Sequence, residues 1–335
     1  MIAAFAALEK RGRLQAFSYD EGPLGAADVE IAVAHCGLCH SDLHLVDDSW
    51  SRSRYPLVPG HEIVGTVVAC GGQVRELRPG QRVGVGWQRG ACLHCDLCVA
   101  GQENLCPEQQ ATCLGHPGGL AERVRVDARF AFPLPDGMEG AAAAPLLCGG
   151  ITVYSPLRRF QVGPHSRVAV VGIGGLGHLA LKMLRAFGCE VTAFSTSASK
   201  RDEALAMGAH DFAASNEPRA VLAHEGRFDL VLSTVHARLD WTTYLRTLRP
   251  RGTLCLVGAP PGLLQIPASL LVTGERSIAG SDIGGRAAIR EMLEFCARHR
   301  IAPQLEELRM DEPNVNLAVE RLRENKVRYR AVLSR

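Results

Sequence analysis

The sequence contains no apolar stretch approaching the length of a membrane-spanning helix, about 20 residues. It also lacks the layout of a secretion signal, because the first residues are apolar before they are charged and read as a first strand. No long run of like charges occurs: the net charge is +2, and the basic groups at 52–54 and 328–330 are typical of solvated surface. These absences argue against a membrane protein and against nucleic acid or anionic membrane as a partner, and they favour a cytoplasmic protein.

The length of 335 residues predicts two domains, because most single domains with one hydrophobic core are shorter. Up to about residue 150, Gly or Pro punctuates short apolar runs such as 29–37, 62–71 and 81–87. This punctuation is typical of strands and turns. The first half is therefore predicted to be mostly β.

From about residue 165 the pattern changes to alternating strands and helices. Strand candidates are 190–196, 228–235, 253–259 and 277–281, and helix candidates between them lie near 199–207, 218–224 and 239–248. The alternation predicts βαβ units and a doubly wound parallel sheet. The tail contains a predicted helix at 286–300 and a second near 314–324, and no internal repeat or low-complexity segment is present.

A glycine-rich turn follows the first strand of the alternating region. Its residues are Gly172, Ile173, Gly174, Gly175, Leu176 and Gly177. The pattern G-x-G-x-x-G is weak alone, but between a strand and a helix it indicates a dinucleotide site: the glycines allow a tight turn, approach to a pyrophosphate and close packing. The free N–H groups of the helix N-terminus favour the phosphates.

The end of the second strand indicates which dinucleotide binds. An NAD site usually carries an acid there, whereas this chain has Ser195, Thr196, Ser197, Lys200 and Arg201, with no acid before Asp202. Hydroxyl and cationic groups suit a 2′-phosphate, and a missing carboxylate removes its repulsion. NADP(H) is therefore predicted over NAD(H).

Twelve cysteines are many for such a chain, and four of them form a local cluster. Cys92, Cys95, Cys98 and Cys106 have the spacing C-x2-C-x2-C-x7-C, which can enclose one tetrahedral Zn²⁺ as a structural site. An iron–sulfur cluster is the rival, because Pro107 follows the last cysteine, but such runs use three intervening residues rather than seven. His94 is expected to be exposed. The remaining cysteines, 36, 70, 113, 189, 255 and 296, are interpreted as buried or incidental thiols.

A second set of possible ligands is scattered through the first half. Cys39, His61 and Cys148 are each ambiguous alone, because a single Cys or His near strands is more often structural. Together, two thiolates and one imidazole would leave a fourth position open for water or substrate, which a catalytic zinc needs.

Several segments together carry a resemblance to a known family. They are 37–44, 59–62, 83–87, the four-cysteine lobe, 146–157, 171–178, 195–200 and 280–285. In their order and spacing the chain resembles the zinc-dependent medium-chain alcohol dehydrogenases over essentially its whole length, particularly the NADP-dependent branch similar to cinnamyl alcohol dehydrogenase.

The resemblance implies roles for residues of the first half. Cys39, His61 and Cys148 would be the catalytic zinc ligands, with Glu62 close enough to replace water transiently. Asp42 would orient His61 by a hydrogen bond, and Ser41 would pass the alcohol proton towards His44. Trp50 and Trp87 would wall the substrate pocket.

The resemblance also implies a cofactor site. His40 would approach the pyrophosphate, Ser41 would contact the nicotinamide ribose in passing the proton to His44, and Thr152 would pack against the nicotinamide. Thr234, Gly258, Ser281, Asp282 and Ile283 would line the rest of the site.

The expected fold is a GroES-like β-barrel catalytic domain, residues 1–150 and 286–335, with a Rossmann cofactor domain, residues 151–285, inserted between its parts. The expected function is hydride transfer between NADP(H) and primary alcohols or aldehydes, with two zinc ions per chain, in a homodimer. An NAD-dependent polyol or secondary-alcohol dehydrogenase is an alternative, although such relatives commonly have Glu as the third ligand. A catalytically silent NADPH- or zinc-binding protein is the alternative from another class.

Overall fold

The computed structural model describes all residues from Met1 to Arg335. The chain forms two compact units, the first made of Met1–Ile151 and Ile283–Arg335 and the second of Thr152–Asp282. The second unit is thus an insertion in the sequence of the first.

The first unit is built mainly from β-strands. Its strands are β1 (Ile2–Ala7), β2 (Leu14–Tyr19), β3 (Asp28–Leu38), β4 (Glu62–Cys70), β5 (Arg82–Val85), β6 (Gln88–Gly90), β7 (Gln110–Ala111), β8 (Arg123–Asp127), β9 (Phe132–Pro133), β16 (Leu305–Arg309) and β17 (Arg330–Ser334). Its helices are α1 (His40–Val46), α2 (Asp96–Val99), η1 (Glu103–Leu105), η2 (Ala128–Phe130), α3 (Gly140–Ala143), η3 (Ala144–Leu147), α10 (Arg286–His299) and α11 (Glu312–Arg323), and α4 (Gly149–Arg159) leads out of the unit.

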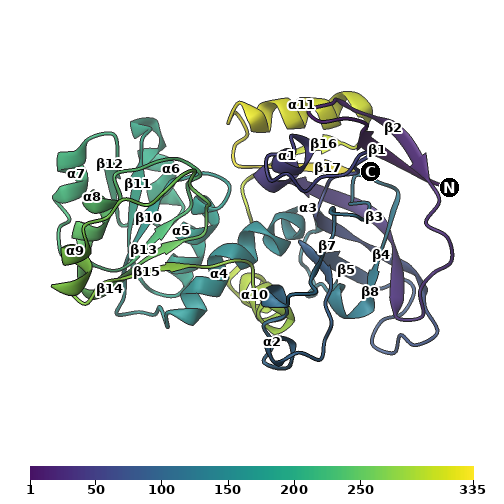
Figure 1. Cartoon of the computed structure of the whole chain (residues 1–335), viewed down its shortest axis with the longest axis horizontal. Coiled ribbons are helices and arrows are strands. Elements are labelled where there is room, and N and C mark those ends of the chain that lie inside the picture. Colours follow the sequence, from purple (N-terminus) through teal and green to yellow (C-terminus); the bar gives the residue numbers. More distant parts are fainter. The chain divides into compact units, whose positions relative to one another are not determined.

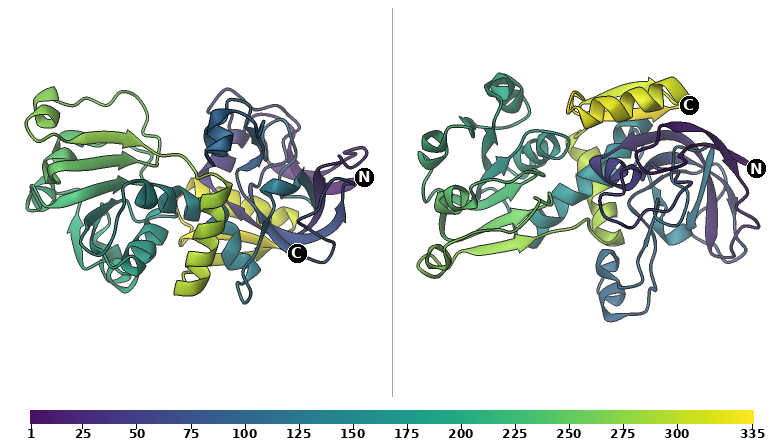
Figure 2. Two further views of the ribbon diagram at one scale, coloured as in Figure 1. Left: turned by 90° about the horizontal axis from the view of Figure 1, so that it is seen from below. Right: turned by 45° about the horizontal axis from the view of Figure 1, so that its top comes forward.

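A mixed sheet of seven strands organises this unit. Its order is β16-β17-β3-β4-β5-β9, with β8 also paired to β3; only β16 and β17 run parallel. β3 is therefore central, because it pairs with the C-terminal strand β17 on one side and with β4 on the other. Helix α11 packs against β2 and β16 (Figures 1 and 2). The apolar side chains of β1, β3, β4, β5 and β8 form one core cluster with those of α11.

The second unit is a six-stranded parallel sheet. Its strands are β10 (Arg167–Val171), β11 (Glu190–Ser195), β12 (Asp211–Ala214), β13 (Phe228–Ser233), β14 (Leu248–Leu256) and β15 (Ser277–Gly280). Its helices are α5 (Gly177–Ala186), η4 (Ala198–Lys200), α6 (Arg201–Ala206), α7 (Pro218–Leu222), α8 (Trp241–Thr247) and α9 (Ala268–Val272).

The strand order of this sheet is β12-β11-β10-β13-β14-β15, and every pair is parallel (Figure 1). The order reverses between β10 and β13, which is the doubly wound arrangement with its ligand crevice at the carboxyl ends of the strands. The predicted doubly wound parallel sheet is confirmed.

No single helix has the length and apolar composition to cross a membrane. One pair of consecutive helical segments, 140–147 and 149–159, meets those criteria only jointly and is bent by 54°.

Candidate functional site

Four metal-binding side chains from distant parts of the sequence meet in the first unit. The donor atoms of Cys39, His61, Glu62 and Cys148 all lie within 4.8 Å of one another. Cys39 follows β3 and is the N-cap of α1, His61 precedes β4 and Glu62 begins it, and Cys148 follows η3. The antiparallel pairing of β3 with β4, in which Gly37 faces Glu62, brings the first three together.

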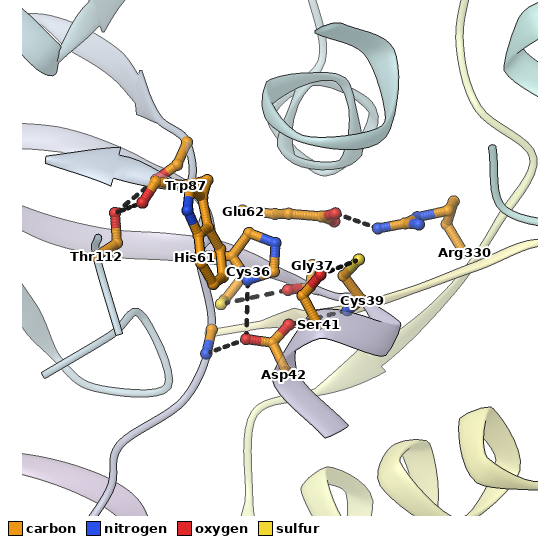
Figure 3. A network of polar contacts seen from close by, with 12 residues as sticks. Cys36, Gly37, Cys39, Ser41, Asp42, His61, Glu62, Trp87, Thr112 and Arg330 are labelled. Carbon is orange, nitrogen blue, oxygen red and sulfur yellow. Dashed lines mark hydrogen bonds and ion pairs between the residues drawn. The ribbon is translucent and has the colours of Figure 1, made fainter. Parts of the chain in front are cut away.

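Asp42 fixes the geometry of this cluster (Figure 3). One carboxylate oxygen accepts from His61 Nδ1 at 2.9 Å and from the Gly60 N–H at 2.9 Å, and the other accepts from the Cys39 N–H at 2.9 Å. The last bond is also half of a capping box that starts α1. Since Nδ1 is engaged, His61 presents Nε2 to the sulfurs, and this buried nitrogen has no hydrogen-bond partner.

The electrostatics of the cluster suit a cation. The contact with Cys148 holds the pKa of Cys39 well below its ordinary value, and the same contact raises the pKa of Cys148. Burial opposes the charged form of His61, but Asp42 and Cys148 outweigh it and raise its pKa. Two thiol sulfurs, an unpaired imidazole nitrogen oriented by a carboxylate and a nearby Glu fit Zn²⁺.

We expect Asp42→Asn to weaken zinc binding about 10- to 100-fold, because the loss of an outer partner of a ligating His typically has that effect. The amide would offer one acceptor oxygen where the carboxylate serves three N–H donors. Competition with a chromogenic chelator measures the affinity. Asp47→Asn is the matched control, because Asp47 ends the same helix and contacts Arg323 instead. Equal zinc affinity in Asp42→Asn and the control would contradict the role assigned to Asp42.

Glu62 is paired with an arginine that the sequence analysis did not identify. Glu62 is completely buried and Arg330 is 4% exposed, and a guanidinium nitrogen of Arg330 donates to Glu62 Oε1 (Figure 3). The pairing of β17 with β3 places Arg330 beside the cluster. The interpretation of 328–330 as solvated surface is therefore wrong for Tyr329 and Arg330, both buried, and holds only for Arg328.

The four cysteines of the lobe form a second cluster. Their sulfurs lie within 4.8 Å of one another, and none of the four forms a disulfide. Three of the separations are 3.5 Å for Cys92–Cys106 and 3.9 Å for Cys92–Cys98 and Cys95–Cys106. Four sulfurs about 2.3 Å from one Zn²⁺ in a tetrahedron would be about 3.8 Å apart. The observed spacing thus fits a closed zinc site. His94 is exposed, as expected.

The aromatic and hydroxyl residues predicted for the substrate side lie around the first cluster. Ser41 and His44 are three residues apart on α1, which puts them on one face of the helix, and Cys39 Sγ donates to Ser41 Oγ at 3.8 Å. Their helix also carries His40, which is exposed.

A row of rings connects the cluster to this helix. The ring centroids of His61 and Trp87 lie 4.9 Å apart, those of Trp87 and Trp50 6.0 Å, and those of Trp50 and His44 5.1 Å. Cys113, interpreted as incidental, also lies within 4.8 Å of His61 and Asp42. Burial raises the pKa of Cys113 to about 11, so it remains a neutral thiol packed behind the histidine.

The glycine-rich turn of the second unit has the geometry of a phosphate site. Gly172 has a φ of +89°, and a Cβ on Gly177 would lie 1.9 Å from the Gly172 carbonyl oxygen, so both positions require glycine. A Cβ on Gly174 would meet nothing within 4 Å, which leaves its backbone open to a ligand. Thr234 Oγ1 donates to the Gly172 carbonyl at 2.8 Å and stabilises the turn.

The hydroxyl-rich end of β11 lies next to this turn. Lys200 Nζ donates to the Ile173 carbonyl at 2.7 Å, Ser195 Oγ accepts from the Ser197 N–H at 3.2 Å, and Ser197 and Ser199 share a hydrogen bond of 2.8 Å. These contacts bring the cationic side chain to the turn with no acid on the strand end.

The other residues predicted for the cofactor lie mostly at the carboxyl ends of the same sheet. Thr152 lies in α4, and Gly175 and Leu176 belong to the glycine-rich turn. Thr196 follows β11 and is exposed, while Gly258 and Ser281 follow β14 and β15. Asp282 is the last residue of the second unit, and Ile283 is the first residue of the part of the chain that returns to the first unit.

Comparison with known proteins gives full-length matches. Two family models match: the alcohol dehydrogenase GroES-like domain over residues 25–136 and the zinc-binding dehydrogenase over residues 175–298. An aldehyde reductase of Synechocystis is 48% identical over 334 residues, covering 100% of this chain and 99% of the relative. NADP-dependent alcohol dehydrogenase C of Mycobacterium bovis is 41% identical over 340 residues, covering 99% and 98%. A solved cinnamyl alcohol dehydrogenase of Sorghum bicolor is 38% identical with a TM-score of 0.95, covering 99% of this chain and 97% of that one.

Proposed function

Because this chain belongs to the zinc-dependent alcohol dehydrogenase family, with a GroES-like domain and a Rossmann domain, we propose that Cys39, His61 and Cys148 hold its catalytic zinc. The protein is an oxidoreductase that transfers hydride between NADP(H) and primary alcohols or aldehydes. The observation that carries the assignment is the buried His61 Nε2, which faces two sulfurs while Asp42 engages the other ring nitrogen. Glu62 is the fourth donor within reach.

Different residues of the site contribute to hydride transfer and to proton transfer in this proposal. Bound zinc supplies Lewis-acid polarisation of the alcohol or carbonyl oxygen, and bound NADP(H) accepts or donates the hydride. In oxidation, Ser41 would accept the proton of the alcohol hydroxyl while its own hydroxyl proton passes on towards His44, on the same face of α1, and His44 would release a proton to solvent. In reduction the proton moves in the opposite direction. Trp50 and Trp87 provide the apolar wall that keeps water from the reacting oxygen.

The second unit binds the cofactor in this proposal. Gly172 to Gly177 receive the pyrophosphate at the N-terminus of α5, with His40 contributing from α1. Ser195, Thr196, Ser197 and Lys200 bind the 2′-phosphate. Thr152, Thr234, Gly258 and Ser281 to Ile283 line the nicotinamide half.

We expect Ser195→Asp to lower the ratio of kcat/KM for NADPH to that for NADH about 100-fold, because juxtaposed like charges cost several kcal/mol. The aspartate could still accept from the Ser197 N–H, as Ser195 Oγ does now. Steady-state kinetics with both cofactors measure the ratio. Ser215→Asp, after β12, is the control for an added charge on a neighbouring strand end. An unchanged ratio would place cofactor choice elsewhere.

The four-cysteine lobe is proposed to hold a second, structural zinc. Elemental analysis of the purified enzyme tests both assignments at once, with two zinc ions per chain expected. One zinc, or iron with visible absorbance, would contradict the proposal.

The domain limits are proposed as 1–150 and 286–335 for the catalytic part and 151–285 for the cofactor part. β15 is an edge strand of its sheet, so its free backbone groups are available for a homodimer contact. We place the enzyme in the cytoplasm, where thiol ligands remain reduced.

A further inference from the structure

A cavity of the first unit lies next to the proposed catalytic zinc ligands. Its volume is about 260 Å³, and it is lined by Arg52, Trp87, Arg89, Gln109, Gln110 and His116 together with small and apolar residues of 111–115. Trp87 belongs both to the cavity lining and to the surroundings of the zinc ligands, because its ring meets that of His61 edge-on with centroids 4.9 Å apart. A molecule in this cavity therefore touches the same indole that packs against the zinc ligand.

The backbone around the cavity is held in register. Arg89 lies in β6, and Gln110 and Ala111 form β7, which pairs with β6. The carbonyl of Trp87 accepts from both the N–H and the hydroxyl of Thr112, at 2.8 and 3.1 Å (Figure 3). The positions of Trp87 and Arg89 are thus fixed by this strand pair and its flanking bonds rather than by a free loop.

The cavity has an excess of positive charge. No acidic residue lines it. Arg89 is half-buried, and burial lowers its pKa, yet its guanidinium makes no hydrogen bond or ion pair. The side chain of Arg52 is also unpaired. Asp28, Glu21 and Asp127 act on Arg89 through space, but none of them forms an ion pair with it, and Glu21 instead lies 3.0 Å from His116 Nε2 and 3.7 Å from Arg125.

Other buried or half-buried arginines of the same unit behave differently. Arg125 pairs with Glu30, Arg286 with Glu103 and Arg330 with Glu62. A partly desolvated guanidinium normally has such a partner, since its five N–H donors lose water on burial. Arg89 is the exception, and its donors face a cavity beside the active site.

We propose that this cavity binds the carboxylate of the substrate, and that the enzyme prefers aldehydes carrying a carboxylate at the far end, that is, ω-oxo acids and the corresponding ω-hydroxy acids. The proposal rests on the function assigned above and names its substrate class. Arg89 binds the carboxylate, with Arg52 at the exposed mouth of the cavity, and the amides of Gln109 and Gln110 are further donors. The indole of Trp87 covers the methylene chain between the two ends of the substrate.

The test compares a charged aldehyde with its uncharged counterpart. With NADPH in excess, kcat/KM is measured for 4-oxobutanoate and 6-oxohexanoate and for their methyl esters. For at least one of the two chain lengths, we expect kcat/KM for the acid to be at least about tenfold higher than kcat/KM for its methyl ester. The ester loses the charge-assisted hydrogen bond to Arg89. A ratio near one for both lengths would overturn the inference.

Substitutions of the cavity arginines test whether the cavity causes the preference for acids over esters. Arg89→Gln is expected to lower the acid-to-ester ratio about tenfold through KM, and Arg89→Lys is expected to restore part of it. Arg52→Gln is expected to have a smaller effect, because Arg52 is exposed. Arg54→Gln is the control, because Arg54 is exposed and lies two residues after Arg52 in the sequence but does not line the cavity. An acid preference that survives both Arg89→Gln and Arg52→Gln would overturn the assignment to this cavity.

A binding measurement keeps the test independent of turnover by the variants. Pentanoate is expected to inhibit reduction of butanal competitively in the unmodified enzyme, and direct calorimetry should show weaker pentanoate binding to Arg89→Gln. Unchanged pentanoate affinity in that variant would contradict the proposal. If no aldehyde, charged or neutral, is reduced with NADPH, the proposed function itself fails, whereas reduction of neutral aldehydes without acid preference removes only this inference.

Discussion

Replacing Cys148 with serine is expected to lower both alcohol oxidation and aldehyde reduction at least about 1,000-fold, because Lewis-acid stabilisation by a bound metal contributes several kcal/mol to the transition state. A serine hydroxyl is a poor ligand for Zn²⁺ beside a thiolate and an imidazole. The zinc content should fall from two ions per chain to one, while binding of NADPH, followed by its fluorescence, should remain, since the glycine-rich turn belongs to the other unit.

A second cysteine of the same unit provides the control for Cys148→Ser. Cys70 lies at the end of β4, and its sulfur donates only to the Leu77 carbonyl at 3.7 Å. Cys70→Ser should keep both zinc ions and full activity. Full activity of Cys148→Ser with one zinc per chain would show that Cys148 is not a ligand of the catalytic metal.

The parts of the molecule that were predictable from the sequence are encoded locally. The glycine-rich turn lies within six residues, and the four lobe cysteines lie within fifteen. The helix predicted at 286–300 is α10, Arg286–His299, because its apolar residues recur with the helical period and its end is marked by basic residues. The alternating pattern after residue 165 likewise predicted the parallel sheet, because its central strands β10, β11 and β13 are short and almost entirely buried apolar runs.

The first metal cluster was predictable only through the family resemblance. Cys39, His61 and Cys148 are brought together by the pairing of β3 with β4 and by the turn after η3, and no local spacing encodes those contacts. Their residue types permitted zinc chemistry without showing that the three side chains meet.

The contact between Glu62 and Arg330 was not predictable at all, because 268 positions separate the two residues. The short strand β17 has basic residues immediately before it, and its pairing with β3 appears only in the folded chain. The pattern Arg-Tyr-Arg is the same for a solvated turn and for a strand that begins with a buried ion pair. Arg89 is similar, because nothing in its sequence neighbourhood distinguishes a cavity-lining arginine from a surface one.

The Glu62–Arg330 pair should make a large contribution to stability that depends on both partners. We expect Arg330→Met to destabilise the enzyme by about 3–5 kcal/mol, because a completely buried carboxylate would lose its counter-charge. Burial already raises the pKa of Glu62 to about 7 against the opposing charge of Arg330. The midpoint of thermal unfolding should fall by roughly 10 °C, as followed by tryptophan fluorescence, to which Trp50 and Trp87 of the first unit and Trp241 of the second contribute.

The double variant Glu62→Gln/Arg330→Met separates the ion pair from the packing of its side chains. Removing both charges should recover much of the stability, because the cost of the single change comes from an isolated buried charge rather than from lost attraction. Arg328→Met is the control, since Arg328 is exposed two residues earlier, and it should shift the midpoint little. If the double variant is as unstable as Arg330→Met, the arginine stabilises the unit by packing under β17, and the charge of Glu62 is balanced by the metal instead.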